Sequence, residues 1–147
     1  RLSRAIQAAR ATSSPFGLLF LDLKKFKPFN DNHGHEVGDQ VLQIVAQRLQ
    51  AQIRSDDLVA RFGGDEFVVM LDGLNEIELL EQRAARIARS LTKPFHIGDL
   101  SCAVGVNIGG AMYPQDSETE DGLLKVADQK MFRAKQSDVD YLVGNRE

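Results

Sequence analysis

The chain has 147 residues, which is enough for one domain with a substantial hydrophobic core. Hydrophobic residues make up 43% and charged residues 27%, a balance typical of globular proteins rather than disordered or fibrous ones. The net charge of −3 excludes a general attraction to nucleic acid or anionic membranes, although a local basic site stays open. Cys102 is the one cysteine, so no internal disulfide framework exists, and its apolar surroundings favour a buried thiol. No apolar stretch approaches the roughly 20 residues of a membrane span, and no signal peptide is visible.

The N-terminal third begins with a short helix and then a buried strand. The first residues, RLSRAIQAAR, lack an initiator methionine, which indicates a piece of a longer protein. Residues 2–10 form an amphipathic pattern that TSSP ends. Residues 16–22, FGLLFLD, are a continuous apolar run closed by an acid, and such runs are typical of strands buried on both faces. Residues 24–35 predict a polar loop or a short, interrupted helix.

A longer helix and a hairpin follow. An apolar residue recurs every fourth position in the helix, which predicts one buried face. This stripe consists of Val37, Val41, Val45, Leu49 and Ile53, widened by Leu42. Residues 58–71 hold two short apolar runs on either side of Gly63 and Gly64. This pattern predicts a β-hairpin, because glycine accepts the positive φ that a tight turn needs.

The second half of the chain alternates further helices and strands. Asn75 is predicted as a helix N-cap, with Glu78 completing a capping-box pattern. The apolar face of that helix is predicted to be Ile77, Leu80, Ala84, Ile87 and Leu91, with Arg83, Arg86 and Arg89 on a different face. Residues 94–98 and 101–113 predict strands, residues 118–136 a helix, and residues 139–143 a final short strand. The stripe of the last helix is predicted to be Leu124, Ala127, Met131 and Ala134.

The order of these elements indicates the fold class. Strands and helices alternate, but a hairpin interrupts the alternation. This order predicts an α/β (α+β) sandwich with a central mixed, mostly antiparallel sheet and helices on its faces. A doubly wound parallel sheet is the less favoured alternative.

Three acidic residues stand at the ends of apolar elements. Asp22 ends the first strand, and Asp65 and Glu66 lie at the turn of the hairpin. If these two elements are neighbours in the sheet, the carboxylates form an oxygen-rich site suited to Mg²⁺ and to phosphoryl or nucleotidyl transfer. The alternative is a plain turn with solvated acids. Asp22 weighs against it, because an acid at the end of a buried strand needs a partner.

The loop after Asp22 is basic, with Lys24, Lys25 and Lys27 in four residues. Loop amides beside a helix start, with lysines next to them, can hold phosphates. The alternative is a solvated basic loop. No P-loop or Rossmann glycine pattern is present, so phosphate binding here would use neither. His33 and His35 lack further zinc-type ligands nearby, which favours a structural role for both.

Several motifs together resemble one protein family. ARFGGDEFVVML at residues 60–71, preceded by LLFLDLKKFKPFNDNHGHEVGDQVL, is similar to the GGDEF domain family of bacterial diguanylate cyclases. AMYP at 111–114 and ADQKMFRAK at 127–135 extend the resemblance over about residues 4–136. It implies a fold like adenylyl cyclase and polymerase palm domains, with a protruding GGDEF hairpin. We expect residues 1–147 to form a single GGDEF domain, N-terminally truncated from a longer protein.

The resemblance also implies a reaction and a metal site. Family members condense two GTP into cyclic di-GMP and release two pyrophosphates. The Asp22 carboxylate and the Leu23 carbonyl would bind Mg²⁺, with Mn²⁺ as the alternative ion. Asp65 would be a metal ligand and the acceptor of the 3′-hydroxyl proton, and Glu66 would support the metals.

Further residues would contact the nucleotide if the resemblance holds. Gly63 and Gly64 would let the hairpin backbone approach GTP. Asn30 and Asp39 would hydrogen-bond the guanine edge. A carboxylate suits that edge, because guanine offers its N1–H and exocyclic amine together and adenine does not.

Phosphate contacts are implied for the basic loop and for the last helix. The backbone amides of Lys25, Phe26 and Lys27 would hold phosphates. The Lys27 side chain would offset charge that develops in the transition state. Lys135, near the end of the last helix, would reach the terminal phosphate.

A second motif, R-x-x-D, precedes the glycines by five residues and consists of Arg54 and Asp57. In the family this is the inhibitory site that binds the product, and an arginine of the following helix can join it. Arg86 is the candidate here, with Arg83 as the alternative. The competing interpretation is an ordinary surface ion pair.

The chain also departs from the family pattern. An arginine that usually follows the last helix and contacts phosphate has no counterpart, and Asp138 and Asp140 lie there instead. We expect this negative charge to weaken binding of GTP phosphates. Asn107 replaces a usual serine, and Lys24 replaces a usual second acid after Asp22.

The leading hypothesis is therefore an Mg²⁺-dependent diguanylate cyclase domain that acts as a homodimer, with product inhibition. The alternative is a degenerate GGDEF domain that binds GTP or cyclic di-GMP without turnover. A purely structural dimerisation domain explains neither Asp22 nor the position of R-x-x-D. The resemblance implies an upstream sensor domain, a cytoplasmic location with a parent that could be membrane-tethered, and no nucleic-acid partner.

Overall fold

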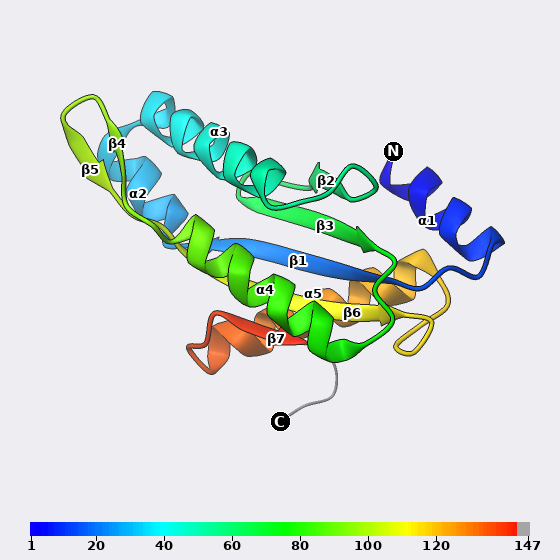
Figure 1. Cartoon of the computed structure of the whole chain (residues 1–147). Coiled ribbons are helices and arrows are strands. Elements are labelled where there is room, and N and C mark those ends of the chain that lie inside the picture. Colours follow the sequence, from blue (N-terminus) through cyan, green and yellow to red (C-terminus); the bar gives the residue numbers. More distant parts are fainter. Residues whose placement is uncertain (144–147) are drawn as a thin grey trace.

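A five-stranded mixed sheet forms the centre of the computed structural model, which describes residues 1–143 (Figure 1). The strands lie in the order β2-β3-β1-β6-β7. Their bounds are β1 Phe16–Lys24, β2 Leu58–Arg61, β3 Glu66–Asp72, β6 Gly105–Tyr113 and β7 Tyr141–Val143. All pairs are antiparallel except β6 with β7, which is parallel. This mixed, mostly antiparallel sheet confirms the predicted fold class.

Helices cover both faces of the sheet (Figure 1). Helices α3 (His35–Ala51) and α4 (Ile77–Leu91) pack on one face, and α1 (Leu2–Ala11) and α5 (Glu120–Gln136) pack on the other. Two separate hydrophobic clusters result, one on each side of the sheet. The sheet is thus the middle layer of a three-layer sandwich.

Strand β1 contributes to both clusters, as its continuous apolar run predicts. Leu19 and Leu21 face α3 and α4, whereas Leu18 and Phe20 face α1 and α5. Because side chains alternate between faces along a strand, Asp22 lies on the α1 and α5 side. The register of β1 therefore decides which face carries the acidic site.

Helix α2 (Phe26–His33) occupies most of the segment that the sequence leaves as a loop or an interrupted helix. Lys25 precedes it in the left-handed region with φ 57°, which turns the chain sharply at the end of β1. Helices α2 and α3 pack closely at Gly38. A Cβ atom there would overlap the Asn30 Oδ1 atom, so the glycine permits this approach.

Helix α5 lies directly on the sheet at Gly109 of β6. A Cβ atom on Gly109 would overlap backbone atoms of Ala127 and Met131. Thr119 caps the start of the helix, and its Oγ1 atom accepts a hydrogen bond of 3.0 Å from the Gly122 amide. The close contact sets the height of α5 above the sheet and so places the residues of its last turn.

Some predicted boundaries and faces are wrong. Helix α4 begins at Ile77 with Glu76 at the N-cap position, so the predicted Asn75 cap is not formed. Arg83 is buried on α4 rather than lying on a polar face, because it pairs with a buried acid described below. Leu123, not Leu124, is the buried residue at the start of α5. Ile53 lies beyond the end of α3, in the turn that follows it.

The predicted strand 101–113 is divided in two. Strands β4 (Phe95–Ile97) and β5 (Leu100–Cys102) form a separate hairpin, and Gly98 has φ 59° at its turn. Arg48 of α3 donates a hydrogen bond of 2.6 Å to the Lys93 carbonyl, just before β4, and so holds the base of this hairpin. Cys102 is buried, as predicted. Among residues 1–143, no helix is both long enough and apolar enough to cross a bilayer.

Candidate functional site

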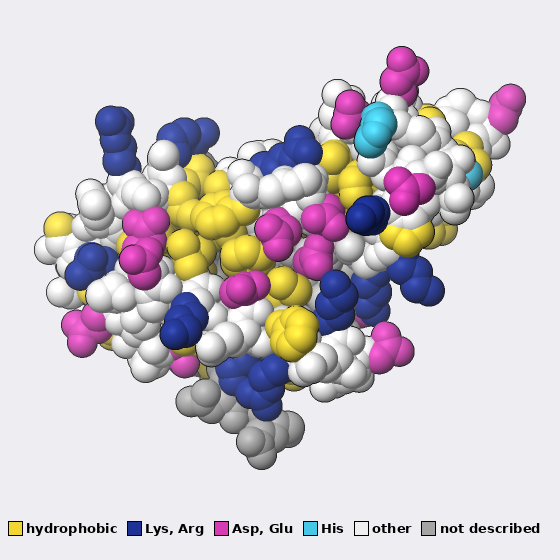
Figure 2. All heavy atoms as spheres, turned by 180° about the vertical axis from the view of Figure 1, so that it is seen from behind, with side chains coloured by type: hydrophobic (Ala, Val, Ile, Leu, Met, Phe, Trp, Pro, Cys, Tyr) yellow, Lys and Arg dark blue, Asp and Glu magenta, His cyan; other side chains and the backbone are white. Residues whose placement is uncertain are grey.

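The acidic residues at the strand ends are brought together by the sheet. Asp22 is directly opposite Glu66 of β3 and directly opposite Asn107 of β6. Directly paired residues of an antiparallel sheet point to the same face, so all three lie on the side of α5. Figure 2 shows acidic side chains gathered near the middle of this face, with hydrophobic side chains beside them. The pairing on which the predicted carboxylate site depended is present.

Asp22 is an underpartnered acid. Its Oδ1 atom is buried and has no hydrogen-bond partner, and its Oδ2 atom lies 3.6 Å from the Lys135 Nζ atom. Burial raises the pKa of Asp22 to about 6, and the neighbouring acids Asp65 and Glu66 act in the same direction. The Lys135 ammonium opposes them. The folded chain thus holds a carboxylate whose negative charge is compensated only in part, by Lys135.

A divalent cation would supply that charge. The unpartnered Asp22 oxygen lies among the carboxylates of Asp65 and Glu66, which are hard oxygen donors. Within residues 1–143, no group of three or more His, Cys, Asp or Glu side chains is placed so that it could hold a metal ion by itself. An incomplete carboxylate set suits Mg²⁺, which takes one or two protein carboxylates and completes its shell with water and phosphate oxygens. The residues present therefore fit Mg²⁺.

The hairpin turn is held by a residue that the sequence did not single out. Arg61 donates from Nε to the Gly63 carbonyl at 3.0 Å and from Nη2 to the Gly64 carbonyl at 2.9 Å. The Leu23 amide donates to the Asp65 carbonyl at 3.2 Å, which joins the turn to β1. A basic residue just before the glycines is the only sequence signal for this role.

The two glycines of the turn act differently from the prediction. Neither has the positive φ that was expected. A Cβ atom on Gly63 would lie 3.0 Å from the Glu66 Oε1 atom, whereas one on Gly64 would meet no heavy atom within 4 Å. Gly63 therefore makes room for Glu66, and the space beside Gly64 is open to a ligand.

The start of α2 presents an anion-binding geometry next to Asp22. The first amides of a helix have no acceptors within the helix, and no side chain caps α2. The amides at this end belong to Lys25, Phe26 and Lys27. Phe26 is buried and anchors the helix start, while Lys25 and Lys27 are exposed. This is the arrangement in which a helix N-terminus attracts phosphate.

The two residues predicted to contact guanine lie on α2 and α3. Asp39 is exposed and lines a cavity of about 470 Å³ between α3 and the β2–β3 hairpin, together with Arg61 and Phe67. Asn30 does not line this cavity. Its Nδ2 atom lies 2.9 Å from His35 Nδ1, and its buried Oδ1 atom has no hydrogen-bond partner. Asn30 thus keeps an unused acceptor, and His35 has the structural role that the sequence favours.

The R-x-x-D motif contains a buried structural acid. Asp57 accepts hydrogen bonds from the amides of Arg54 and Asp72, both at 2.9 Å, and its Oδ2 atom lies 3.2 Å from Arg83 Nη2. Its side chain is only 2% exposed. Of the two candidate arginines of α4, Arg83 faces Asp57. The side chains of Arg54 and Arg86 are exposed.

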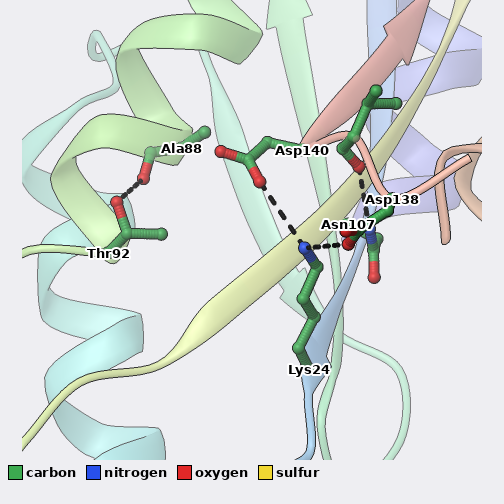
Figure 3. A network of polar contacts seen from close by, with 7 residues as sticks. Lys24, Ala88, Thr92, Asn107, Asp138 and Asp140 are labelled. Carbon is green, nitrogen blue, oxygen red and sulfur yellow. Dashed lines mark hydrogen bonds and ion pairs between the residues drawn. The ribbon is translucent and has the colours of Figure 1, made fainter.

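The departures near the end of the chain face one another (Figure 3). Lys24 Nζ lies 3.5 Å from an Asp138 oxygen and 3.7 Å from an Asp140 oxygen. Asn107 donates to the Val139 carbonyl at 2.9 Å in the same turn. The two acids therefore pair with the lysine of β1, and their charge is partly compensated within the chain.

Comparisons with known proteins identify the family of the chain. The family model described as diguanylate cyclase, GGDEF domain, matches residues 1–140. The chain is 37% identical over 135 residues to the bifunctional diguanylate cyclase/cyclic di-GMP phosphodiesterase MucR of Pseudomonas aeruginosa, covering 92% of this chain and 20% of MucR. It is 40% identical over 136 residues to the diguanylate cyclase TpbB of the same organism, covering 92% of this chain and 31% of TpbB.

A solved structure gives the same result for the fold. The crystal structure of the GGDEF domain of TpbB superposes with a TM-score of 0.90 at 36% identity, covering all of this chain and 92% of that domain. The chain spans less than a third of the two curated relatives but nearly all of the solved domain. The chain belongs to the diguanylate cyclase GGDEF domain family.

Proposed function

We propose that the chain is a diguanylate cyclase domain that condenses two GTP into cyclic di-GMP and two pyrophosphates with Mg²⁺. The observation that carries the proposal is the unpartnered Asp22 oxygen, set beside Asp65 and Glu66 and next to the start of α2. Membership of the family supports the reaction class. The carboxylates and the free amides together offer the charges that a nucleoside triphosphate and its metal need.

Each side chain has a distinct part in the proposed reaction. Bound Mg²⁺ would be held by Asp22, the Leu23 carbonyl, Asp65 and Glu66, and would stabilise negative charge on the phosphates. Asp65 accepts the proton of the 3′-hydroxyl. That oxygen forms a bond to the α-phosphorus of the other GTP while the bond from this phosphorus to the β-phosphate bridge breaks and pyrophosphate leaves.

Phosphate and base contacts come from the two helices beside β1. The amides of Lys25, Phe26 and Lys27 hold phosphate oxygens, and the Lys27 side chain offsets charge in the transition state. Asp39, which lines the cavity beside β2 and β3, and Asn30 hydrogen-bond the guanine edge. Gly64 leaves room for the nucleotide beside the hairpin.

We infer that two copies of the domain must meet, because each holds one GTP and each 3′-hydroxyl attacks the nucleotide of the other. A domain outside this chain would control that meeting in response to a signal. The relatives are several times longer than the matched segment, which leaves room for such a domain in them. A GTP-dependent role also places the domain in the cytoplasm.

The decisive experiment uses the chain fused to a dimeric coiled coil and incubated with GTP and Mg²⁺. Cyclic di-GMP should accumulate, measured by chromatography, and chelation of the metal should stop it. Asp65→Ala should abolish turnover, whereas Asp99→Ala in the exposed β4–β5 turn should not. Retained activity in Asp65→Ala would remove the role given to that carboxylate.

We also propose product inhibition through the R-x-x-D loop, with a modified assignment of roles. The exposed Arg54 and Arg86 side chains would bind product phosphates, and Asp57 would hold the loop in shape. Arg54→Ala should then relieve inhibition by added cyclic di-GMP, while Arg89→Ala on the same face of α4 should not. Equal inhibition in the parent chain and in Arg54→Ala would eliminate this second site.

The alternative function is GTP or cyclic di-GMP binding without turnover. One observation favours it: Asp138 and Asp140 pair with Lys24 after α5, where the family pattern has an arginine that contacts phosphate. Calorimetry with GTP separates the two functions. Binding without product in the fused dimer would establish the binding module and reject the enzyme.

A further inference from the structure

We propose that Lys24 and Asn107 form a clasp on the turn that follows α5 and that this clasp positions Lys135 against Asp22. The turn consists of residues 137–140. The inference rests on the proposed function for its catalytic readout, because Lys135 matters to turnover only if the chain handles GTP. Both clasp residues act through Lys135 and are positioning residues.

The first half of the clasp is ionic (Figure 3). Lys24 Nζ reaches Asp138 at 3.5 Å and Asp140 at 3.7 Å from the end of β1. The lysine side chain is 27% exposed, so it lies partly against the protein, while the two acids are mostly solvated. A Cβ atom on Gly105, the β6 partner of Lys24, would lie 2.9 Å from the lysine stem. Gly105 therefore opens the path that the lysine follows.

The second half of the clasp is a buried hydrogen bond. Asn107 is 1% exposed, and its Nδ2 atom donates to the Val139 carbonyl at 2.9 Å. The amide of Ile108 donates to the Asp140 carbonyl at 2.7 Å. The turn is thus held to β6 by two hydrogen bonds and to β1 by the lysine.

The turn is rigidly connected to the last turn of α5. The Asp138 amide donates to the Lys135 carbonyl, and the Val139 amide donates to the Ala134 carbonyl. A shift of the turn must therefore move Lys135. At the other end, Lys24 is two residues from Asp22 and Asn107 is directly opposite it. The clasp consequently holds both Lys135 and its contact partner Asp22 to the same part of the sheet.

Disrupting the ionic half and disrupting the hydrogen-bonded half should have effects of different size on the KM for GTP. Ion pairs with solvated acids are weak and screened by salt, whereas a buried donor and acceptor are costly to separate. Lys24→Glu should raise the KM for GTP about fivefold in the fused dimer, with a smaller change in kcat. Asn107→Ala should raise it about tenfold.

A charge exchange tests the ionic half. Lys24→Glu combined with Asp138→Lys and Asp140→Lys should restore KM to within about twofold of the parent, because the pairs re-form with reversed sign. Lys125→Glu, an equal charge change on an exposed position in the first half of α5, should leave KM unchanged. A triple variant as impaired as Lys24→Glu would overturn the ionic half.

A double-mutant cycle with Lys135→Ala tests the positioning role. If the clasp acts through Lys135, Lys24→Glu and Asn107→Ala should each change KM less than about twofold once Lys135 is absent. Undiminished effects in that background would mean general damage to the site and would overturn the proposal.

The clasp has a readout that does not depend on turnover. Thermal unfolding should show coupling between Lys24→Glu and the two lysine substitutions, with the triple variant more stable than the sum of its parts predicts. If the parent chain makes no cyclic di-GMP, the proposed function fails, and the same cycle is measured with GTP affinity in place of KM. Additive stabilities and additive affinities would overturn the clasp itself.

Discussion

Two aspartates contact opposite ends of β3, and the same type of side chain has very different partners at the two places. Asp22 lies across from Glu66, where β3 begins, and Asp57 binds the amide of Asp72, where β3 ends. Asp57 is 2% exposed and receives two amides and a guanidinium. Asp22 is 14% exposed, has one oxygen without a partner, and lies beside other acids.

The contrast separates a structural acid from one that we propose to be functional. Asp57 is fully hydrogen-bonded within the fold, so its charge holds the loop, helix and strand together. Asp22 is compensated only in part, by Lys135, and in the proposed function a metal ion supplies the missing positive charge. The saturation of a buried carboxylate, rather than its burial alone, therefore predicts whether it serves stability or chemistry.

The largest expected effect comes from Asp22→Asn. Turnover should fall at least about a hundredfold, because the metal loses a charged ligand. The metal-free chain should nevertheless become more stable at neutral pH, by on the order of 2 kcal/mol, since the unfavourable charge disappears. Chemical denaturation and a GTP assay measure both quantities. A variant that loses activity and stability together would contradict the contrast, and Asp99→Asn is the matched control.

Asp57→Ala should lower the stability of the chain, whereas Asp22→Asn should raise it. Asp57→Ala leaves Arg83 buried without its partner and removes the acceptor of two amides, so stability should fall by about 3 to 5 kcal/mol. Asp56→Ala, an exposed neighbour in the same loop, should change stability little. Denaturation midpoints compare the two. Equal small losses would show that the saturated acid contributes no more than a surface residue.

The pH dependence of stability sharpens the contrast further. The folded-state pKa of Asp22 is about 6, above the ordinary value of 3.8, so the folded state binds more protons than the unfolded state between these values. The contribution of Asp22 to the free energy of unfolding should therefore fall as pH rises through this window and then stay constant. This contribution is isolated by chemical denaturation of the parent and Asp22→Asn chains at a series of pH values in the presence of a metal chelator. A difference between them that does not vary with pH would contradict the raised pKa.

Arg61→Ala should have the smallest effect on stability. Arg61 is the counterpart of Arg83 at the other end of β3, but it binds the backbone carbonyls of the turn instead of a carboxylate. Stability should fall by only about 1 kcal/mol. Turnover should fall about tenfold, because the turn that carries Asp65 loosens. Arg61→Lys, which cannot donate to both carbonyls from one planar group, should restore little activity.

Much of the sheet was predictable because its signals are local. The apolar run ending at Asp22 indicated a strand buried on both faces, and the apolar runs around the glycines indicated a hairpin. Local signals failed where packing decides. Helix α4 begins after Glu76 instead of Asn75. Arg83 was predicted away from the apolar face, but it is buried with Asp57, a partner 26 residues away that no local pattern reveals.

Sequence alone determined the family and indicated the candidate site residues, which are the acids at the strand ends and the basic loop. Only the tertiary structure decided how each is used. The strand register placed Asp22, Glu66 and Asn107 in one row across the sheet. Packing of distant elements saturated Asp57 and left Asp22 unsaturated. The same packing turned the acids after α5 toward Lys24. The reason is physical: the charge state and role of a carboxylate depend on its burial and partners, and those partners come from segments far away in the sequence.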